Sequence, residues 1–528
     1  MASVLLFVTS VILLCILANR FSDKLGMPAL LLFMALGMLF GSDGIVKISF
    51  DDYVVTEKIC LVALMFIIFY GGFGTKWEIA KPVAAKSLAV STVGTLVTAL
   101  LTCGFCHFFL HISFEESFLI GAVISSTDAA SVFSILRSKN LDLKYGTASL
   151  LELESGSNDP VAYMLTILGL AFLKGEKIFV PGMLFTQVVF GILVGVAAAV
   201  LGCIVIEKTD TLSEGFDTIF VIAIVIISYA GADLINGNGF LSVYLTGIIM
   251  GNRKLKNKVS LVHFFDALTG MAQIALFFLL GLLSYPHKII TVLPIALAIA
   301  LFLTFVARPI AVTAILKPLK CSLKQCALIS CAGLRGAASI VFAIMAISHG
   351  AVLENDLYHI VFFISLFSVS VQGSLLAFVA KKLDMIEEGG NILKTFTDYQ
   401  EESAITMIRF FIPEGHGWVN KEIQEVTLPA GSLALMIKRD SGTIIPKGDT
   451  VIKAGDSVIL SVPEYQATGE VSLKEIQIDK YHDWNGKSIA ELNLPDDILI
   501  AMLKRGEENI IPRGKTTIQE NDIVVIYD

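Results

Sequence analysis

The stretch Glu152-Leu153-Glu154-Ser155-Gly156-Ser157-Asn158-Asp159-Pro160 lies inside a longer apolar run, residues 148–173. An ionisable group costs free energy at the middle of a bilayer, so each carboxylate in such a run is a candidate functional group. At 100° per residue, Glu152, Ser155 and Asp159 lie on one face of a helix. We interpret the run as a membrane-spanning helix with a polar site on this face. Because Glu152 lies near the beginning of the run, we expect it to be a solvated entrance charge.

A second face of the same helix carries Glu154 and Asn158, which are four residues apart. Pro160 cannot donate a backbone hydrogen bond, so it frees the carbonyl of Gly156. A carboxylate at Asp159, a nearby hydroxyl and a free carbonyl together offer the oxygen ligands that a hard cation prefers. The pattern therefore indicates a binding site for a monovalent cation.

The composition of the whole chain agrees with a membrane protein. Of its 528 residues, 55% are hydrophobic and 16% are charged, and the mean hydropathy is +0.76. Soluble proteins are about 45–50% apolar and about 25% charged. The apolar residues cluster in thirteen runs: 3–19, 28–41, 58–73, 87–111, 117–136, 148–173, 182–206, 216–235, 238–252, 259–284, 289–316, 323–348 and 354–380. These predict an all-α polytopic membrane domain over residues 1–382, with about thirteen transmembrane helices.

Charges between the runs predict how this domain is oriented. With the N-terminus outside, the inner loops hold eighteen Lys and Arg residues and the outer loops hold five. Cytoplasmic loops carry the excess of positive charge, so this orientation is favoured. The odd number of runs then places the C-terminus in the cytoplasm.

Two further apolar runs are interrupted by polar residues. The fifth run contains Ser125–Ala130, which includes Thr127 and Asp128, and the twelfth contains Gly333–Ser339, which includes Arg335. Broken helices are typical of transporters at the depth where the substrate binds. We interpret three serines as hydrogen-bonding groups between helices, namely Ser125, Ser126 and Ser157.

Other polar residues in the runs are interpreted as structural. Arg308-Pro309 is expected to kink the eleventh run, and Asp266 lies near the inner end of the tenth. Asn238 lies close to an outer break, where it would belong to a vestibule or a helix cap.

The residues after about 400 form an internal repeat with an offset of 66. Trp418 matches Trp484, and Ile444-Ile445-Pro446-Lys447-Gly448 matches Ile510-Ile511-Pro512-Arg513-Gly514. Alternating apolar residues in each copy predict strands. We predict a linker over 383–399 and two small α+β domains over 400–466 and 467–528.

The charge and the cysteines change at the same boundary. Through Lys382 there are 25 Lys and Arg against 22 Asp and Glu, a net charge of +3, and after it 14 against 25, a net charge of −11. All eight cysteines precede the boundary, so nothing in the tail suggests an oxidising compartment. An acidic tail disfavours nucleic acid as a partner.

The membrane part resembles the monovalent cation/proton antiporter-1 family of NhaP type. The resemblance covers residues 1–382 and rests on Thr127-Asp128, Glu154-Ser155-x-x-Asn158-Asp159, Gly-Leu-Arg335-Gly and the stretch from Asn238 to Asn252. It implies an inverted-repeat fold in which runs five and twelve are unwound and cross at mid-membrane.

The resemblance also implies roles for individual residues. Asp159 would bind the transported cation or the proton, and Ser155 and the backbone around Thr127 would complete the site. We assign Asn158 and Asp128 to the same cation- and proton-binding group, and a carboxylate such as Asp128 can also steady the ends of a broken helix. In this family, an Asn-Asp pair such as Asn158-Asp159, in place of the Asp-Asp pair of other relatives, is associated with electroneutral exchange. Glu154 would pair with Arg335. The sequence Thr127-Asp128-Ala129, where many sodium-handling relatives have Thr-Asp-Pro, looks closer to the potassium/proton branch.

The tail resembles the tandem C-terminal subdomains of potassium-conductance regulators, RCK-C or TrkA-C. The resemblance implies sensing of a small-molecule effector, such as cyclic di-AMP. The alternative is a dimerisation or stability module. No Gly-x-Gly-x-x-Gly motif is present, so we expect no nucleotide-binding Rossmann half and no cofactor.

We therefore predict an electroneutral K⁺/H⁺ antiporter of the bacterial cytoplasmic membrane, a homodimer regulated by its tail. A Na⁺/H⁺ antiporter is the alternative within the class. A ligand-gated cation channel is the alternative from another class, but the sequence has no Thr-Val-Gly-Tyr-Gly filter. An enzyme is not expected, because the sequence offers no nucleophile–base pair or metal-ligand cluster.

Overall fold

The structure is a computed structural model with two compact units, Met1–Glu401 and Glu402–Asp528. It describes residues 2–25, 28–138, 141, 143–208, 216–253, 255, 258–387, 405–426, 428, 432–439, 442–463, 473–479, 482–492, 499–505, 508–510 and 512–527. The predicted linker therefore lies, from residue 388 onward, outside the described residues. So does the predicted boundary between residues 466 and 467.

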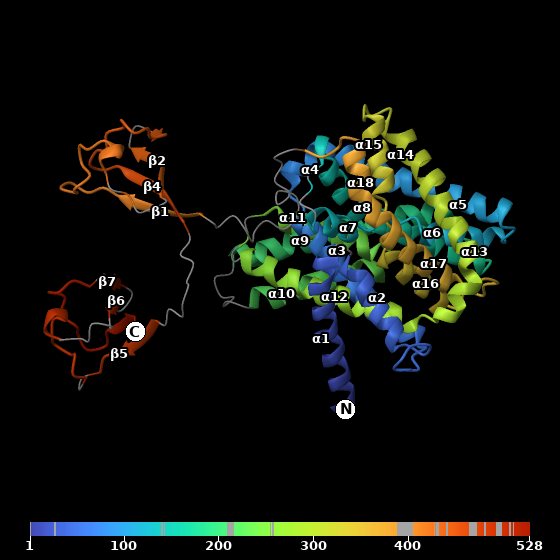
Figure 1. The fold of residues 1–528 in the computed structure, drawn as a ribbon, viewed down its shortest axis with the longest axis horizontal. Coiled ribbons are helices and arrows are strands. Elements are labelled where there is room, and N and C mark those ends of the chain that lie inside the picture. Colours follow the sequence, from blue (N-terminus) through green and yellow to red (C-terminus); the bar gives the residue numbers. More distant parts are fainter. Residues whose placement is uncertain are drawn as a thin grey trace. The chain divides into compact units, whose positions relative to one another are not determined.

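The first unit is a bundle of helices (Figure 1). Its α-helices are α1 (Ala2–Leu25), α2 (Ala29–Phe40), α3 (Tyr53–Gly74), α4 (Trp77–Ala89), α5 (Thr95–Phe109), α6 (Phe114–Val123), α7 (Ala129–Ser138), α8 (Thr147–Leu173), α9 (Val180–Lys208), α10 (Phe216–Leu234), α11 (Gly239–Gly251), α12 (Lys258–Leu283), α13 (Pro286–Phe302), α14 (Arg308–Leu316), α15 (Leu323–Cys331), α16 (Ala337–Ser348), α17 (Leu357–Phe367) and α18 (Gly373–Lys382).

Many of these helices are long and apolar enough to cross a membrane. By length and composition, eight helical segments of the described chain meet this requirement. Three shorter apolar helices, α2, α11 and α16, accompany them. The predicted class, a polytopic helical membrane domain, is confirmed. The number thirteen stays a prediction.

Three of the long segments contain a short π-helical turn. The turn Val90–Gly94 joins α4 to α5, Leu303–Ala307 joins α13 to α14, and Ser368–Gln372 joins α17 to α18. π-Helical turns are rare and frequently occur at functional sites. Arg308 follows directly after the second of these turns, so the predicted irregularity of the eleventh run takes the form of a π-turn.

Two helical pairs are broken at their centres, as the sequence predicts. The chain leaves helical geometry between α6 and α7 and again between α15 and α16. The breaks meet, because the backbone N–H of Asp128 donates to the carbonyl of Leu334 at 2.8 Å. Each break is followed by a helix that packs beside it, α8 after the first and α17–α18 after the second. A broken pair of helices followed by a helix packed beside it therefore occurs twice in the unit.

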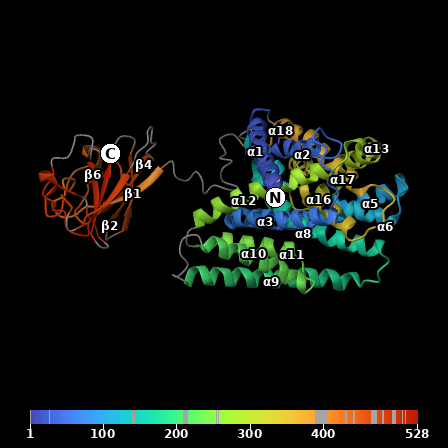
Figure 2. The same cartoon turned by 90° about the horizontal axis from the view of Figure 1, so that it is seen from below.

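The helix α8 packs against both broken and unbroken helices. It contacts α4, α6, α7 and α16, and it also contacts α3, α9 and α11. In Figure 2 the helices α9, α10 and α11 run alongside one another and α3 lies next to them. The polar stretch of α8 consequently lies between two groups of helices.

The second unit contains two four-stranded antiparallel sheets of the same design. One has the order β1-β4-β2-β3 and the other the order β5-β8-β6-β7. The strands are β1 (Ile405–Phe411), β2 (Leu433–Arg439), β3 (Gly442–Ile444), β4 (Ser457–Pro463), β5 (Leu473–Gln477), β6 (Leu499–Arg505), β7 (Glu508–Ile510) and β8 (Ile523–Tyr527).

The two sheets repeat in detail at the predicted offset of 66. The register shifts between Ala434 and Met436 in one sheet and between Ile500 and Met502 in the other. Each copy has its own apolar cluster, and the two clusters include Trp418 and Trp484 at their edges. A matching ion pair between a partly exposed arginine and a buried aspartate completes each copy, Arg439–Asp456 and Arg505–Asp522. The repeated sequence therefore forms two copies of one small fold.

Candidate functional site

Asp159 lies on α8 opposite the break between α6 and α7. The hydroxyl of Ser126, in that break, donates to Oδ1 of Asp159. The Asp159 residue as a whole is half-buried. One oxygen of the carboxylate is thus held by the broken helix.

The unwound backbone at Thr127 is held by α8. The hydroxyl of Ser155 donates to the carbonyl of Thr127 at 2.6 Å. The N–H of Thr127 donates to Oδ1 of Asn158 at 3.4 Å, and Nδ2 of Asn158 donates to the hydroxyl of Thr127. The structure therefore brings together Asp159, Ser155, Asn158 and Thr127, which the sequence grouped as one site. Their roles in binding a cation or proton stay predictions.

Asp128 caps the helix that follows the break. Its carboxylate accepts from the N–H of Ser131 at 3.4 Å and from the hydroxyl of Ser131 at 2.6 Å, at the beginning of α7. A carboxylate at a helix N-terminus satisfies free N–H groups and opposes the positive end of the helix dipole. This geometry agrees with the predicted steadying role of Asp128.

The predicted pairing of Glu154 with Arg335 is wrong. Glu154 pairs with Arg308, whose Nη2 lies 2.7 Å from Oε1 of the carboxylate, and both side chains are 1% exposed. Glu154 is on the face of α8 that lies away from Asp159, and Arg308 reaches it from the first residue of α14. Arg308 is therefore part of the network that supports the site.

Arg335 binds the carbonyl end of a half-helix. Its Nη1 donates to the carbonyls of Ser125 and Ser126, each at 2.7 Å. These carbonyls lie just beyond the end of α6, where a cation offsets the negative end of the helix dipole. Because Ser126 also donates to Asp159, Arg335 contacts the same segment that contacts the carboxylate.

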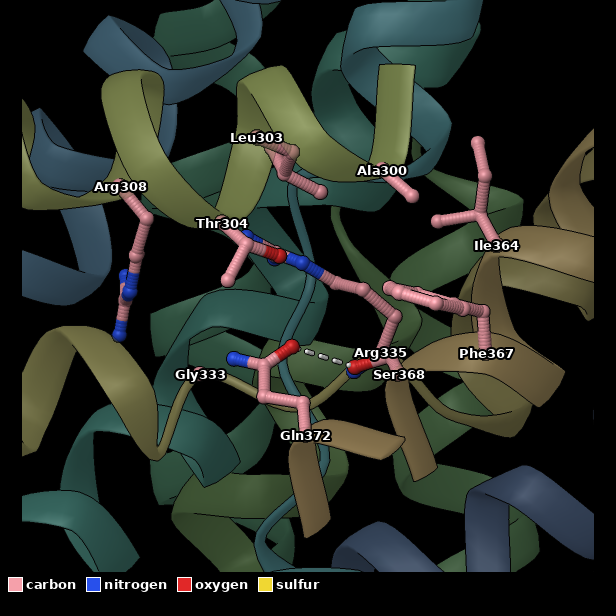
Figure 3. A pocket seen from close by; sticks show the side chains of 10 residues that line it. All are labelled: Ala300, Leu303, Thr304, Arg308, Gly333, Arg335, Ile364, Phe367, Ser368 and Gln372. Carbon is pink, nitrogen blue, oxygen red and sulfur yellow. Dashed lines mark hydrogen bonds between the residues drawn. The ribbon is translucent and has the colours of Figure 1, made fainter. Parts of the chain in front are cut away.

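Arg335 is itself held in place by the last long helix. Its backbone N–H donates to the hydroxyl of Ser368 at 3.0 Å, and that hydroxyl donates to Gln372 at 3.0 Å (Figure 3). The amide nitrogen of Gln372 donates to the carbonyl of Cys331 at 2.7 Å. The π-helical turn Ser368–Gln372 thus supplies the groups that fix the second break.

A small cavity lies between the two arginines (Figure 3). Its lining includes Arg308, Arg335, Thr304, Ser368 and Gln372. Within the described part of the chain, Nε and Nη1 of Arg308 and Nε and Nη2 of Arg335 have no hydrogen-bond partner. The cavity therefore borders the supporting network and not the carboxylate of Asp159.

Sequence reasoning missed three residues that contact the site or the network supporting it. Ser126 and Arg308 were interpreted as structural. Asn238 was placed in a vestibule or a cap, and it does cap α11, but its Nδ2 also donates to the carbonyl of Pro160 at 2.8 Å. The position of Ser126 beside Thr127 was the available signal. No spacing within the sequence connects Asn238 to Pro160.

The expectation for Glu152 is also wrong. The residue is 6% exposed and its Oε1 accepts from the hydroxyl of Thr75 at 3.3 Å. It is buried because α3, which ends next to Thr75, packs against α8.

The family comparisons cover most of the chain. Residues 9–382 match the family model described as sodium/hydrogen exchanger, transmembrane. Residues 407–466 and 473–527 match the TrkA-C domain.

Individual relatives agree with these matches. The chain is 34% identical over 454 residues to a protein of Alkalimonas amylolytica named K(+)/H(+) antiporter NhaP, covering 85% of this chain and 79% of the relative. It is 30% identical over 449 residues to K(+)/H(+) antiporter NhaP2 of Shewanella sp. (strain ANA-3), covering 84% and 78%. The fold is similar to the solved structure of the sodium proton antiporter MjNhaP1 from Methanocaldococcus jannaschii, with a TM-score of 0.64 at 21% identity, over 71% of this chain and 97% of the other.

Proposed function

This chain belongs to the sodium/hydrogen exchanger family, and from that membership we propose that it exchanges one K⁺ for one H⁺ across the cytoplasmic membrane. The choice of potassium is supported by the relatives at 34% and 30% identity, both named K(+)/H(+) antiporters. The sequence Thr127-Asp128-Ala129 favours the same branch. The regulatory role of the tail is supported by its match to the TrkA-C domain.

One observation carries the proposal. The carboxylate of Asp159 accepts from Ser126, and Ser155 and the carbonyl of Thr127 lie on the same side of α8. A carboxylate, hydroxyls and a carbonyl can coordinate a cation after it loses water, and the carboxylate alone can bind a proton. Cation and proton then compete for one site.

The charges around the site explain why exchange would be coupled. Arg308 and Arg335 carry two positive charges, and Glu154 and Asp128 carry two negative charges. With these four in balance, Asp159 is neutralised by either K⁺ or H⁺, but it is left as a bare charge when the site is empty. A bare buried charge is costly, so the loaded protein changes conformation more easily than the empty one. The carboxyl group of Asp159 is therefore expected to reach the two sides of the membrane alternately.

Orientation and assembly complete the proposal. We place the N-terminus outside and the C-terminus in the cytoplasm, following the excess of cations on the inner loops. We also propose a homodimer, formed by the membrane part. Na⁺ is the second candidate ion, because the family is described as a sodium/hydrogen exchanger.

Transport in proteoliposomes tests the proposal. Adding K⁺ should collapse an imposed proton gradient at lower concentration than adding Na⁺ does, and an imposed membrane potential should not change the rate. Asp159→Asn should abolish the exchange while the protein stays folded. Asp217→Asn, in the first turn of α10, removes a carboxylate elsewhere in the unit and should keep the activity.

Three results would contradict the proposal. Substantial exchange by Asp159→Asn would remove Asp159 from the site. Acceleration by a membrane potential would mean unequal numbers of ions and protons. A response to Na⁺ alone would replace potassium by the second candidate.

A further inference from the structure

The face of α8 that carries Asp159 continues toward the beginning of the helix. Glu152, Gly156 and Asp159 are spaced i, i+4 and i+7, so they form one stripe on the helix surface. Seven residues of helix correspond to about 10 Å along the axis, which separates the two carboxylates. Gly156 lies between them and leaves a notch in the stripe.

The notch is filled by the tip of Tyr244 from α11. A Cβ placed on Gly156 would lie 2.6 Å from Cε2 of Tyr244, 2.8 Å from Cζ and 2.8 Å from the phenolic oxygen. Tyr244 is 3% exposed, and within the described residues its hydroxyl makes no hydrogen bond of good geometry, although the hydroxyls of Ser157 and Thr75 lie beside it. A buried hydroxyl is ordinarily paired, since leaving it unpaired costs free energy. The phenolic oxygen of Tyr244 therefore lies on the stripe and is available to coordinate a cation.

The other end of the stripe also offers oxygen atoms. The single hydroxyl proton of Thr75 is shared between two acceptors, the carbonyl of Gly71 at 2.8 Å and Oε1 of Glu152 at 3.3 Å. The carbonyl of Thr75 accepts from Nδ2 of Asn252 at 2.9 Å. Glu152 and Thr75 therefore place a carboxylate and a hydroxyl between α3 and α8. The helix α11 packs against both of these helices.

We propose that Glu152 and the hydroxyl of Tyr244 form a second station for a monovalent cation, on the route between the cytoplasm and Asp159. The inference rests on the proposed function and names a further binding site for the same ion. The carboxylate of Glu152 attracts the cation into the interface between α3 and α8. The hydroxyl of Tyr244, which lies over Gly156, then replaces part of its water as the ion passes along α8 toward Asp159.

The physical reason for such a station is the cost of removing water. A cation that moves directly from solvent to a buried carboxylate loses its hydration in one step, and intermediate oxygen ligands divide that cost. The station should bind weakly, because an ion that is held tightly would not move on.

Transport kinetics measured from each side of the membrane test the station. In vesicles with the cytoplasmic face outward, Glu152→Gln and Tyr244→Phe should each raise the K⁺ concentration for half-maximal exchange at least fivefold. In vesicles of the opposite orientation the same variants should change it less than twofold. The maximal rate at saturating K⁺ should be retained, which a merely structural role would not predict.

Matched controls separate the station from general effects. Glu116→Gln removes a buried carboxylate of α6 that accepts from the N–H of Asn355. Tyr358→Phe removes a buried hydroxyl of α17 that donates to the carbonyl of Leu280. Both should leave the half-maximal K⁺ concentration unchanged on both sides.

A direct measurement uses Tl⁺ as a substitute for K⁺. Crystals of the full chain carrying Asp159→Asn should keep anomalous density for Tl⁺ between Glu152 and Tyr244, and Glu152→Gln in the same background should remove it. Absence of that density, or equal effects of the variants from both sides, would overturn the station. If the unmodified protein did not exchange K⁺ for H⁺ in the same vesicles, the proposed function itself would fail, so the two failures are distinguishable.

Discussion

Glu154 and Arg308 place opposite charges where neither side chain reaches solvent. Removal of one member of such a pair leaves an uncompensated buried charge, which costs about 3–5 kcal/mol. We therefore expect Arg308→Ala to lower the stability of the purified protein by roughly this amount. The double variant with Glu154→Ala should lose less than the sum of the two single variants, as measured by unfolding in detergent.

Arg335 supplies the comparison for this double-mutant cycle. Among the described residues its guanidinium donates to the carbonyls of Ser125 and Ser126, and Glu154 pairs with Arg308 instead, so Arg335→Ala and Glu154→Ala should give nearly additive losses. Strong coupling between Arg335 and Glu154, with none between Arg308 and Glu154, would contradict the structure's assignment.

The sequence could predict the site but not its ion pair. The spacing of Glu154 from Asp159 assigns the two carboxylates to different faces of α8, and this is a local property of a helix. The choice between Arg308 and Arg335 depends on which of two distant helices packs against each face. Each arginine lies in or next to an irregular segment of an apolar run. The local sequence therefore predicts that both require an acidic partner.

At the scale of elements, the crossing of the two broken helices depends on close contact. A Cβ on Gly336 would lie 2.2 Å from Oδ2 of Asp128 and 2.5 Å from its Cβ. Gly336→Ala should therefore displace Asp128 and reduce transport at least tenfold. Gly270→Ala in α12 is the matched control, because its Cβ would meet no atom within 4 Å. Equal activity of both variants in proteoliposomes would mean that the crossing tolerates displacement.

The breaks were predictable because polar and glycine residues interrupt apolar runs at matching places in the two halves. The π-helical turns were not. Val90–Gly94 contains nothing that distinguishes it from the regular helix on either side, and only Arg308-Pro309 hinted at an irregularity near Leu303–Ala307. Such turns arise from the packing of neighbouring helices, which a run of apolar residues does not encode.

The tail sheets provide a prediction for pH. The Arg439 guanidinium, which donates to Asp456, and the N–H of Lys453 hold the pKa of the Asp456 carboxyl below its ordinary range. A carboxyl group whose pKa is lower in the folded than in the unfolded chain stabilises the fold at pH values above its ordinary pKa of about 3.9. This stabilisation is lost as the pH falls through the lowered pKa. The Arg505 guanidinium acts on Asp522 in the same way. We therefore expect the tail to unfold below about pH 4.

Tryptophan fluorescence can follow this transition. Trp418 and Trp484 each lie at the edge of one copy's core, so the full chain carrying Trp77→Phe reports on the tail alone. Asp456→Asn should lose this contribution to the acid transition and cost about 1.5–3 kcal/mol at neutral pH. An unchanged acid midpoint in both Asp456→Asn and Asp522→Asn would show that other groups control it.

At the scale of the whole molecule, one chain joins an exchanger unit to two copies of a TrkA-C fold. The repeat was predictable because an offset of 66 aligns rare residues, such as Trp418 with Trp484, and each copy has an apolar core of its own. This pattern does not show what the tail binds, because strands and turns determine a fold but not its ligand.

Deletion of residues 400–528 tests the proposed regulation. A tail can favour one conformation of the exchanger only if it binds that conformation better, and a coupling of about 1–3 kcal/mol corresponds to a change of about 5–150-fold. The truncated protein should therefore keep K⁺/H⁺ exchange in proteoliposomes but lose its response to a cytoplasmic effector, with cyclic di-AMP as the first to be tried. Lack of transport by a folded truncated protein would make the tail part of the exchanger itself. If the full chain ignores cyclic di-AMP and other nucleotides, and calorimetry detects no binding, the tail is a dimerisation or stability module instead.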